Sequence, residues 1–279
     1  MPVTNVQANI LCLLASRRDP ESYVAGSTPI NRNAPRYSGD IDVFHDREER
    51  VARAAAEDGA LLEKEGYTLE WRRRDATIHS VLARRANEAT KLEWVADSDF
   101  RFFPAVRDVE FGYVLHPADH LATNKVAAAY GRREPRDIVD LITIHDTILP
   151  IGAAVWAAAG KALGFTPEGI IDEIRRNSRY TAEDFHRIHS DPPIDPAATM
   201  IRLRQILTEA EAFVARMPTE KVGLLFLKGD EVVQPDPDKL DEYQTHAGQR
   251  RGHWPSSPEI TAAMFERAAQ NRQKPPPNS

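Results

Sequence analysis

The chain has 279 residues, of which 42% are hydrophobic and 28% charged, and its net charge is −6. This length suffices for one large or two modest domains, and the balance is ordinary for a soluble globular protein rather than a polycation that coats nucleic acid. The longest apolar runs, near Ile10–Ala15 and Ile151–Ala159, are too short to span a bilayer. With Cys12 as its only cysteine and no export signal, the sequence predicts a cytoplasmic protein with no membrane partner.

The first half of the chain alternates between helical and strand periodicity. Its expected elements are a helix over 5–16, a strand over 22–25, a loop over 30–38, a strand over 39–44, a helix over 46–65, strands over 67–72, 77–82 and 91–95, and a short strand over 111–115. Asp46 is a suitable N-cap for the helix over 46–65, with Glu49 three residues later.

The second half is mostly helical. Helices are expected over 119–132, 135–148, 151–163, 167–176, 197–216 and 258–270, with a hairpin between 222–226 and 231–233. We therefore predict an α+β fold in which a core over 1–148 carries a short mixed sheet flanked by helices. A helical domain with the small hairpin follows over 149–270, and 271–279 form a disordered tail.

Two aspartates lie on one strand shortly after a small-residue turn. Asp40 and Asp42 alternate with apolar residues, so both carboxylates face the same side of the strand. They repel each other unless a cation lies between them, and magnesium accepts such hard oxygen ligands. The turn Gly26-Ser27 offers backbone N–H groups and a hydroxyl to phosphate oxygens. Together these residues indicate a metal-dependent nucleotide site.

A third carboxylate is expected from a neighbouring strand. Glu93 is the lone acid in the apolar strand Lys91–Val95, so it is our candidate for completing a cluster that holds one or two magnesium ions. A solvent-facing strand residue is an equally good interpretation of Glu93. Asp97 and Asp99 are the rivals, although they follow the strand in an expected turn.

Lys125 stands in a helix that is otherwise made of small residues. It either extends to solvent or serves as a cationic arm over a triphosphate. Eleven residues later begins the segment Arg136-Asp137-Ile138-Val139-Asp140-Leu141, in which Asp137 and Asp140 share a helical face. Asp137 either orients Lys125 or a substrate hydroxyl, or it is a capping acid in a surface ion pair.

These motifs in this order resemble the AbiEii/AbiGii-type nucleotidyltransferases, which are toxins of abortive-infection and type IV toxin–antitoxin systems and to which the MenT toxins are similar. The resemblance covers roughly 20–145 and implies a polymerase-β-like nucleotidyltransferase core. It implies that Asp40 and Asp42, with Glu93, bind Mg²⁺ or Mn²⁺. It also implies that Gly26, Ser27, Lys125 and Arg136 bind the nucleotide, with Asp137 as a catalytic or orienting acid. Many members have a second glycine where Ser27 stands, and often an aspartate as third acid.

The expected function is magnesium-dependent transfer of a nucleoside monophosphate from a nucleoside triphosphate to an acceptor hydroxyl. The resemblance favours RNA, particularly a tRNA 3′ end, in a toxin with a cognate antitoxin protein. Clustered arginines such as Arg132-Arg133 would suit an RNA acceptor. Two alternatives stay open: transfer to a protein or a small molecule, and a sensor that binds nucleotide or RNA without catalysis.

Overall fold

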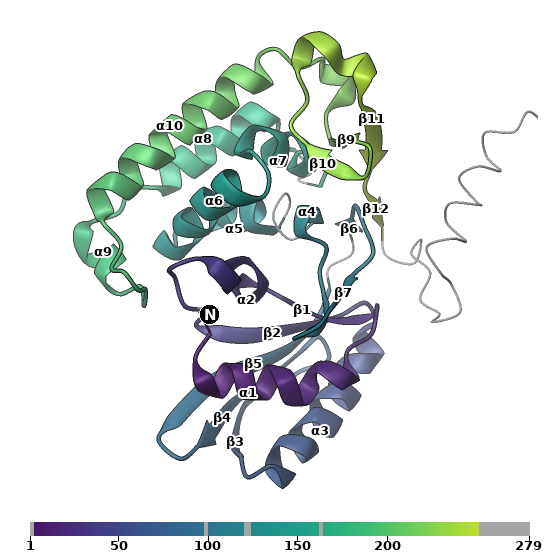
Figure 1. The fold of residues 1–279 in the computed structure, drawn as a ribbon, viewed down its shortest axis with the longest axis vertical. Helices are drawn as coiled ribbons and strands as arrows, with labels where there is room; N and C mark the ends of the chain where they lie inside the picture. Colours follow the sequence, from purple (N-terminus) through teal and green to yellow (C-terminus); the bar gives the residue numbers. More distant parts are fainter. Residues whose placement is uncertain (1–2, 98–99, 120–123, 162–163, 251–279) are drawn as a thin grey trace, which may run out of the picture.

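In the computed structural model, a mixed seven-stranded sheet lies beneath a layer of helices (Figure 1). The structure describes residues 3–97, 100–119, 124–161 and 164–250. The sheet has the order β3-β4-β5-β2-β1-β8-β7. Its strands are β1 (Ser22–Ala25), β2 (Asp40–His45), β3 (Thr68–Arg74), β4 (Ile78–Arg85), β5 (Glu88–Ala96), β7 (Val106–Asp108) and β8 (Gly112–Val114). The helices are α1 (Asn5–Leu14), α2 (Ser27–Ile30), α3 (Glu48–Lys64), α4 (Pro117–Asp119), α5 (Val126–Gly131), α6 (Pro135–Thr147), α7 (Ile151–Ala158), α8 (Pro167–Asn177), α9 (Ala182–His186) and α10 (Pro196–Val214).

Strand β2 lies at the middle of the sheet, antiparallel to β1 and parallel to β5. Successive side chains of β2 point to opposite faces of the sheet. Ile41 and Val43 are buried on one face, whereas Asp40 and Asp42 lie on the other face and are only partly buried. The register places Glu93 of β5 directly beside Asp42. The acidic face of two neighbouring strands therefore follows from the sequence pattern of each.

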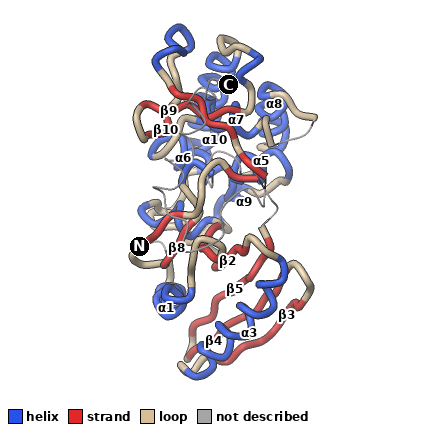
Figure 2. The backbone as a smooth tube through the Cα atoms, turned by 90° about the vertical axis from the view of Figure 1, so that its right-hand side faces the viewer, coloured by secondary structure: helices blue, strands red, loops and turns tan. Residues whose placement is uncertain are grey.

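Helices α1 and α3 cover the apolar face of the sheet, and Figure 2 shows α3 lying along β4 and β5. Ile10 of α1 and Leu62 of α3 are fully buried against this face, as is Trp94. The indole N–H of Trp94 donates to Asp58 at 2.8 Å, and Asp58 also pairs with buried Arg18 at 2.6 Å. Burial of a charged pair is tolerated here because hydrogen bonds satisfy it.

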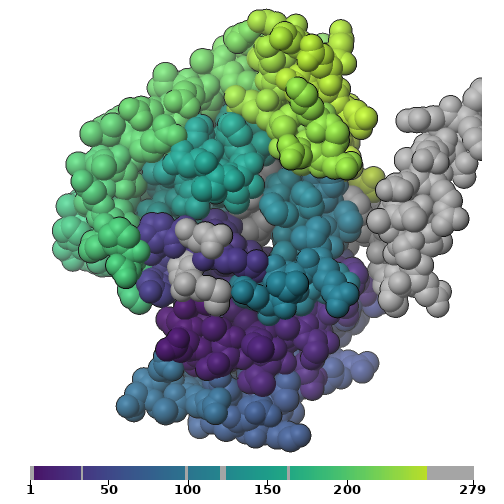
Figure 3. Space-filling view, in the orientation of Figure 1, coloured from purple at the N-terminus to yellow at the C-terminus, as the bar shows by residue number. Residues whose placement is uncertain are grey.

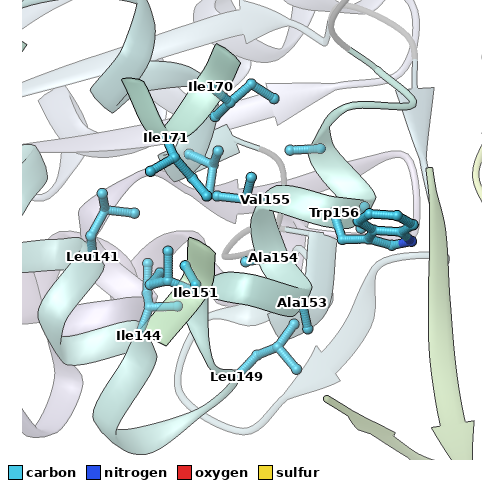
Figure 4. Close-up of a cluster of buried hydrophobic side chains, with 14 of the residues drawn as sticks. Leu141, Ile144, Leu149, Ile151, Ala153, Ala154, Val155, Trp156, Ile170 and Ile171 are labelled. Atoms are coloured by element: carbon cyan, nitrogen blue, oxygen red, sulfur yellow. The ribbon is translucent and has the colours of Figure 1, made fainter. Parts of the chain in front are cut away.

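The helical layer has its own hydrophobic core, part of which Figure 4 shows. Helix α7 is apolar on all sides and every residue of it is buried, as expected for a central core helix. It packs against α8 and α10, while Leu141 and Ile144 attach α6 to the same cluster. The indole N–H of Trp156 donates to the carbonyl of Lys221 at 2.7 Å. Helices α5 and α6 are thus part of the helical layer.

Two small sheets complete the structure. Strands β9 (Leu224–Lys228), β10 (Glu231–Val233) and β11 (Gln244–Ala247) form one, in the order β10-β9-β11. Strand β12 (Gln249–Arg250) pairs with β6 (Phe100–Arg101) and so links the far end of the described chain to its middle. Figure 3 shows the resulting arrangement, with the first strands and helices below and α10 above.

The structure confirms the α+β class, with its mixed sheet flanked by helices and a mostly helical second half that carries a hairpin. Strand β11 adds to that hairpin and was not predicted, nor were α9, β6, β7 and β12. The expected helix over 258–270 and the tail over 271–279 lie outside the described residues. Among the described residues, no single helix is long and apolar enough to cross a membrane; only α6 and α7 taken together pass that test, and they are bent by 114°.

Two local predictions were wrong. The expected loop over 30–38 begins with helical turns, because α2 and a 3₁₀ segment follow β1 immediately. Asp46 does not cap α3, which begins at Glu48; its carboxylate instead accepts hydrogen bonds from Tyr23 and Arg101. The helix expected over 119–132 is seen in two parts, α4 up to Asp119 and a π-helical turn over 124–125 that continues into α5; residues 120–123 between them lie outside the described residues.

Candidate active site

Three carboxylates gather on the face of the sheet that points to the helical layer. One oxygen each of Asp40, Asp42 and Glu93 lies within 4.8 Å of the other two. Asp40 and Asp42 come from β2, and Glu93 reaches them because the parallel register sets it beside Asp42. This spacing would allow one cation to contact all three groups. Since β2 and β5 are central strands of the sheet, the backbone holds the three side chains in place.

The electrostatics of this cluster fit a cation. Burial, followed by the charges of Asp40 and Glu93, raises the pKa of Asp42 to about 7. A carboxyl group with such a pKa is destabilised in its charged form, and a divalent cation would remove that penalty. The donor set is composed of hard oxygens, as magnesium and manganese prefer. Lys91, two residues before Glu93 on β5, supplies one positive charge at 2.6 Å from the Glu93 carboxylate.

The turn between β1 and α2 brings Ser27 to the start of β2. Gly26 has φ +70°, and a Cβ atom at this position would overlap the carboxylate of Asp42, so the turn requires glycine. Buried Ser38 holds the turn: its hydroxyl lies 2.9 Å from that of Ser27, accepts from Thr28 at 3.1 Å, and donates to the carbonyl of Asp40 at 2.8 Å. The Gly26-Ser27 turn and the acidic strand are thus joined by hydroxyl groups.

Lys125 faces this turn from the helical layer, just before α5. Its side chain is largely buried, and its Nζ lies 2.6 Å from Asp140 and 3.9 Å from Asp137. Arg36 also binds Asp140, through two parallel hydrogen bonds of 2.8 and 2.9 Å. Burial would raise the pKa of Asp140, but the charges and hydrogen bonds of Lys125 and Arg36 outweigh it and hold the pKa at about 2. Asp140 therefore stays ionised and fixes the ammonium group of Lys125.

Asp137 is fully buried and serves a second cation. Arg132 donates to both of its oxygens, at 2.7 and 2.9 Å. The structure thus places Asp137 behind Lys125 and Arg132. The side chain of Arg136 lies on the same side of the site as those of Lys125 and Arg132, and it is 40% exposed.

A cleft of about 360 Å³ lies between the sheet and the helical layer, and the acidic cluster lines it together with the turn and the three cations. Its sheet side carries the acidic cluster together with Gly26 and Ser27, and its helical side carries Lys125, Arg132 and Arg136. One wall would hold a cation and the other would hold anionic oxygens. A nucleoside triphosphate with its metal ion has this distribution of charge.

The structure brings together the residues that the motifs singled out: Gly26, Ser27, Asp40, Asp42, Glu93, Lys125 and Arg136 all line the cleft. Asp97 is placed elsewhere, at the end of β5, where it accepts a hydrogen bond from the hydroxyl of Tyr23. Asp99 lies outside the described residues.

Sequence reasoning missed four residues of this site. Arg36 and Ser38 stand in an aperiodic segment, and Lys91 was treated only as part of a strand. Asp140 was noted as sharing a face with Asp137, but not as the anchor of Lys125. The signal for Asp140 was its position three residues after Asp137 on one helix; Arg36 carried no local signal, since its partner is 104 residues away.

No protein-family model and no curated protein sequence matches the chain. Among solved structures, it is similar to MenT4, a nucleotidyltransferase toxin of Mycobacterium tuberculosis H37Rv, with a TM-score of 0.55 and 16% identity over 77% of this chain and 83% of that one. A candidate nucleotidyltransferase from H. pylori matches with a TM-score of 0.46 and 14% identity over 76% and 93% of the two chains. The likeness to MenT4 confirms the resemblance seen in the sequence at the level of the fold: this chain has a nucleotidyltransferase fold.

Proposed function

We propose that this protein is a magnesium-dependent nucleotidyltransferase that moves a nucleoside monophosphate from a nucleoside triphosphate to the 3′ hydroxyl of an RNA, with tRNA as the first candidate. The observation that carries the proposal is the cleft with an acidic wall on β2 and β5 and a cationic wall before α5 and on α6. The MenT4-like fold supports it.

In this proposal Asp40, Asp42 and Glu93 would hold Mg²⁺, or Mn²⁺ in its place. Such an ion supplies positive charge to the phosphate oxygens and to the attacking hydroxyl. Lys125, fixed by Asp140, contacts the β- and γ-phosphates, and the Ser27 hydroxyl donates to the same oxygens. Arg132 is held by Asp137 and adds a second fixed positive charge. These groups act by position and charge, which is the main requirement of phosphoryl transfer.

The reaction balances without any further reagent. The acceptor oxygen bonds to the α-phosphorus while the bond from that phosphorus to the bridging oxygen of the β-phosphate breaks. Pyrophosphate leaves between Lys125 and Ser27, and the proton of the acceptor hydroxyl passes to the carboxylate cluster and then to solvent. The ordered cationic wall stabilises the negative charge that builds up on the leaving group.

A labelling experiment tests the proposal. The protein is incubated with MgCl₂, total RNA and each of the four α-³²P-labelled nucleoside triphosphates in turn, beside an Asp40→Ala/Asp42→Ala control. We expect label on RNA from the wild type and none from the control. Label on protein bands would redirect the activity to protein acceptors. Nucleotide binding without any transfer would identify a sensor instead.

The biological part of the proposal is a cytoplasmic toxin that is neutralised by an antitoxin protein. It rests on the toxin assignment of MenT4 and on the motif pattern between Gly26 and Asp140. Expression from a tightly controlled promoter should stop growth, and Asp40→Ala/Asp42→Ala should restore it. Normal growth with active wild-type protein would contradict the toxin assignment and leave the transferase intact.

A further inference from the structure

A second cavity, of about 390 Å³, opens beside the cleft. Arg136 lines both, so the two spaces are one side chain apart. The second cavity also contains Arg36, Arg133 and Arg187, with two acids, Glu134 and Asp184, among its lining residues. The chain as a whole carries a net charge of −6. Four arginines at this one place are therefore a local feature and not a reflection of general basicity.

Two segments that lie far apart in the sequence, one before β2 and one after α9, meet at this cavity. The amide of Tyr37 donates to the carbonyl of His189, and the amide of Asp191 donates to that of Pro35, each at 2.9 Å. The rings of Tyr37 and His189 stack at 4.2 Å with 12° between their planes. The loop after α9 is thereby fixed to the segment that enters β2, three residues before Asp40.

Three of the four arginines have donor capacity to spare. Arg36 is buried and donates twice to Asp140 and once to the carbonyl of Tyr37, whereas Nε of Arg136 lies 3.7 Å from the Glu134 carboxylate and has no hydrogen-bond partner among the described residues. Arg133 is exposed and donates to the carbonyl of Arg179. Arg187 is 72% exposed and pairs with Glu183 at only 3.6 Å. A guanidinium group has five N–H donors, so Arg133 and Arg187 keep most of theirs for a ligand.

We infer that this cavity binds the phosphodiester groups of the single-stranded acceptor RNA next to its reactive 3′ end. Lys125, Ser27 and Arg132 already provide the contacts for one triphosphate in the cleft, so a second cationic space suits a ligand whose phosphates continue beyond it. A positive groove beside stacked aromatic rings is how proteins bind single strands without reading their sequence. The inference rests on the proposed function, because it names the acceptor of the same site.

Binding of a fluorescein-labelled 12-nucleotide single-stranded RNA of mixed sequence tests this inference. Arg133→Gln/Arg187→Gln removes two cavity charges, and Arg84→Gln/Arg85→Gln removes two exposed charges from β4 as the matched control. We expect about tenfold weaker binding for the cavity pair only. We also expect its slope of log affinity against log salt to fall by about 1.4, since each phosphate contact on a single strand contributes about 0.7.

Two further measurements separate the sources of phosphate and the aromatic contribution. The affinity for MgATP should stay within about twofold in the cavity variant; a loss of MgATP affinity with unchanged RNA affinity would assign the arginines to the triphosphate. His189→Ala should weaken RNA binding severalfold without a change in salt slope, because stacking releases no counterions. Equal losses in both arginine pairs, or no RNA binding by the wild type, would overturn the inference.

The labelling experiment distinguishes failure of the proposed transferase function from failure of the RNA-binding assignment of the cavity. If the wild type labels RNA, the cavity variant should show a raised KM for RNA with an unchanged kcat at saturating RNA. If it labels RNA with an unchanged KM in the variant, the proposed function stands and the cavity assignment is wrong. If no label is transferred but RNA binding still depends on Arg133 and Arg187, the cavity assignment stands and the transferase does not.

Discussion

Asp140 contacts Lys125, Arg36 and Asn31, which come from two segments of the chain, one before α5 and one between α2 and β2. All of these partners donate to it, and it is fully buried. Asp140→Asn leaves the two cations without their counter-charge, so we expect it to lower the free energy of unfolding at pH 7 by about 3–5 kcal/mol. Urea unfolding at pH 7 measures this, with Asp238→Asn as a control in an exposed ion pair, for which less than about 1 kcal/mol is expected.

The same residue gives a pH dependence. The pKa of Asp140 in the folded protein is about 2, below the ordinary 3.8. Its contribution is therefore fully present above pH 3.8 and is lost as the pH falls toward 2. The gap in stability between wild type and Asp140→Asn should shrink by about 1 kcal/mol between pH 6 and pH 3. A gap that stays constant over this range would contradict the assigned pKa.

Gly26 is the second position at which one residue controls the site. Gly26→Ala adds strain at φ +70° and pushes a methyl group into the Asp42 carboxylate. Gly229→Ala adds similar strain at φ +62° in open space. Both should lose about 1–2 kcal/mol of stability, but only Gly26→Ala should lower nucleotidyl transfer, by about 100-fold, since it displaces a group of the proposed reaction centre. Equal activities would show that Asp42 tolerates the shift.

Residue patterns in the sequence located one wall of the cleft better than the other. Asp40 and Asp42 could be placed on one face from alternation alone, because a strand's periodicity is a local property. The ion pair between Arg36 and Asp140 could not be predicted, since it joins residues 104 positions apart and Arg36 stands in an aperiodic segment before β2. Lys125 was recognised through the family pattern, and its fixed position became visible only with Asp140.

At the level of elements, hydroxyl groups hold the junction between α2 and β2: those of Ser38 and Thr28 both reach the Asp40 carbonyl, and that of Ser38 also contacts Ser27 and Thr28. Ser38→Ala removes a donor to the Asp40 carbonyl and a partner of Ser27 and Thr28. We expect a loss of about 1–2 kcal/mol, together with a raised KM for the nucleoside triphosphate because Ser27 loses its support. Ser80→Ala on β4 is the matched control, since that buried hydroxyl has no hydrogen-bond partner among the described residues. An unchanged KM in Ser38→Ala would remove Ser38 from the site.

The elements also show where local patterns fail. The 3.6-residue period of α3 was correct, but its expected cap at Asp46 was not, because Tyr23 and Arg101 bind that carboxylate. Arg101 lies 55 residues away in β6, an element of two residues with no periodicity to detect. Tertiary contacts thus override a capping preference of about 1 kcal/mol.

For the whole molecule, the two walls of the cleft belong to different hydrophobic clusters. The acidic wall rests on the cluster under the sheet, and α5 and α6 rest on the helical cluster. A ligand that contacts both walls should stabilise the protein as a unit. Mg²⁺ with a nucleoside triphosphate at 100 times its Kd should add about 2.7 kcal/mol, or about 5–10 °C in Tm.

Thermal melts measure this coupling with magnesium alone, nucleotide alone and both together. The largest shift should require both, and Asp40→Ala/Asp42→Ala should lose the joint effect while keeping any shift from nucleotide alone. An equal shift with nucleotide alone in the wild type would show that the cationic wall binds without help from the acidic one.

The pairing of β12 with β6 also sets an order in time. Strand β6 leaves the ribosome about 150 residues before its partner at Gln249–Arg250 is made, and chains fold from the N-terminus as they are synthesised. Asp40 likewise emerges 100 residues before Asp140, the anchor of its facing wall. A nascent chain would thus expose the acidic strand for seconds before Lys125 is fixed opposite it, so the cleft would stay open throughout the early part of translation.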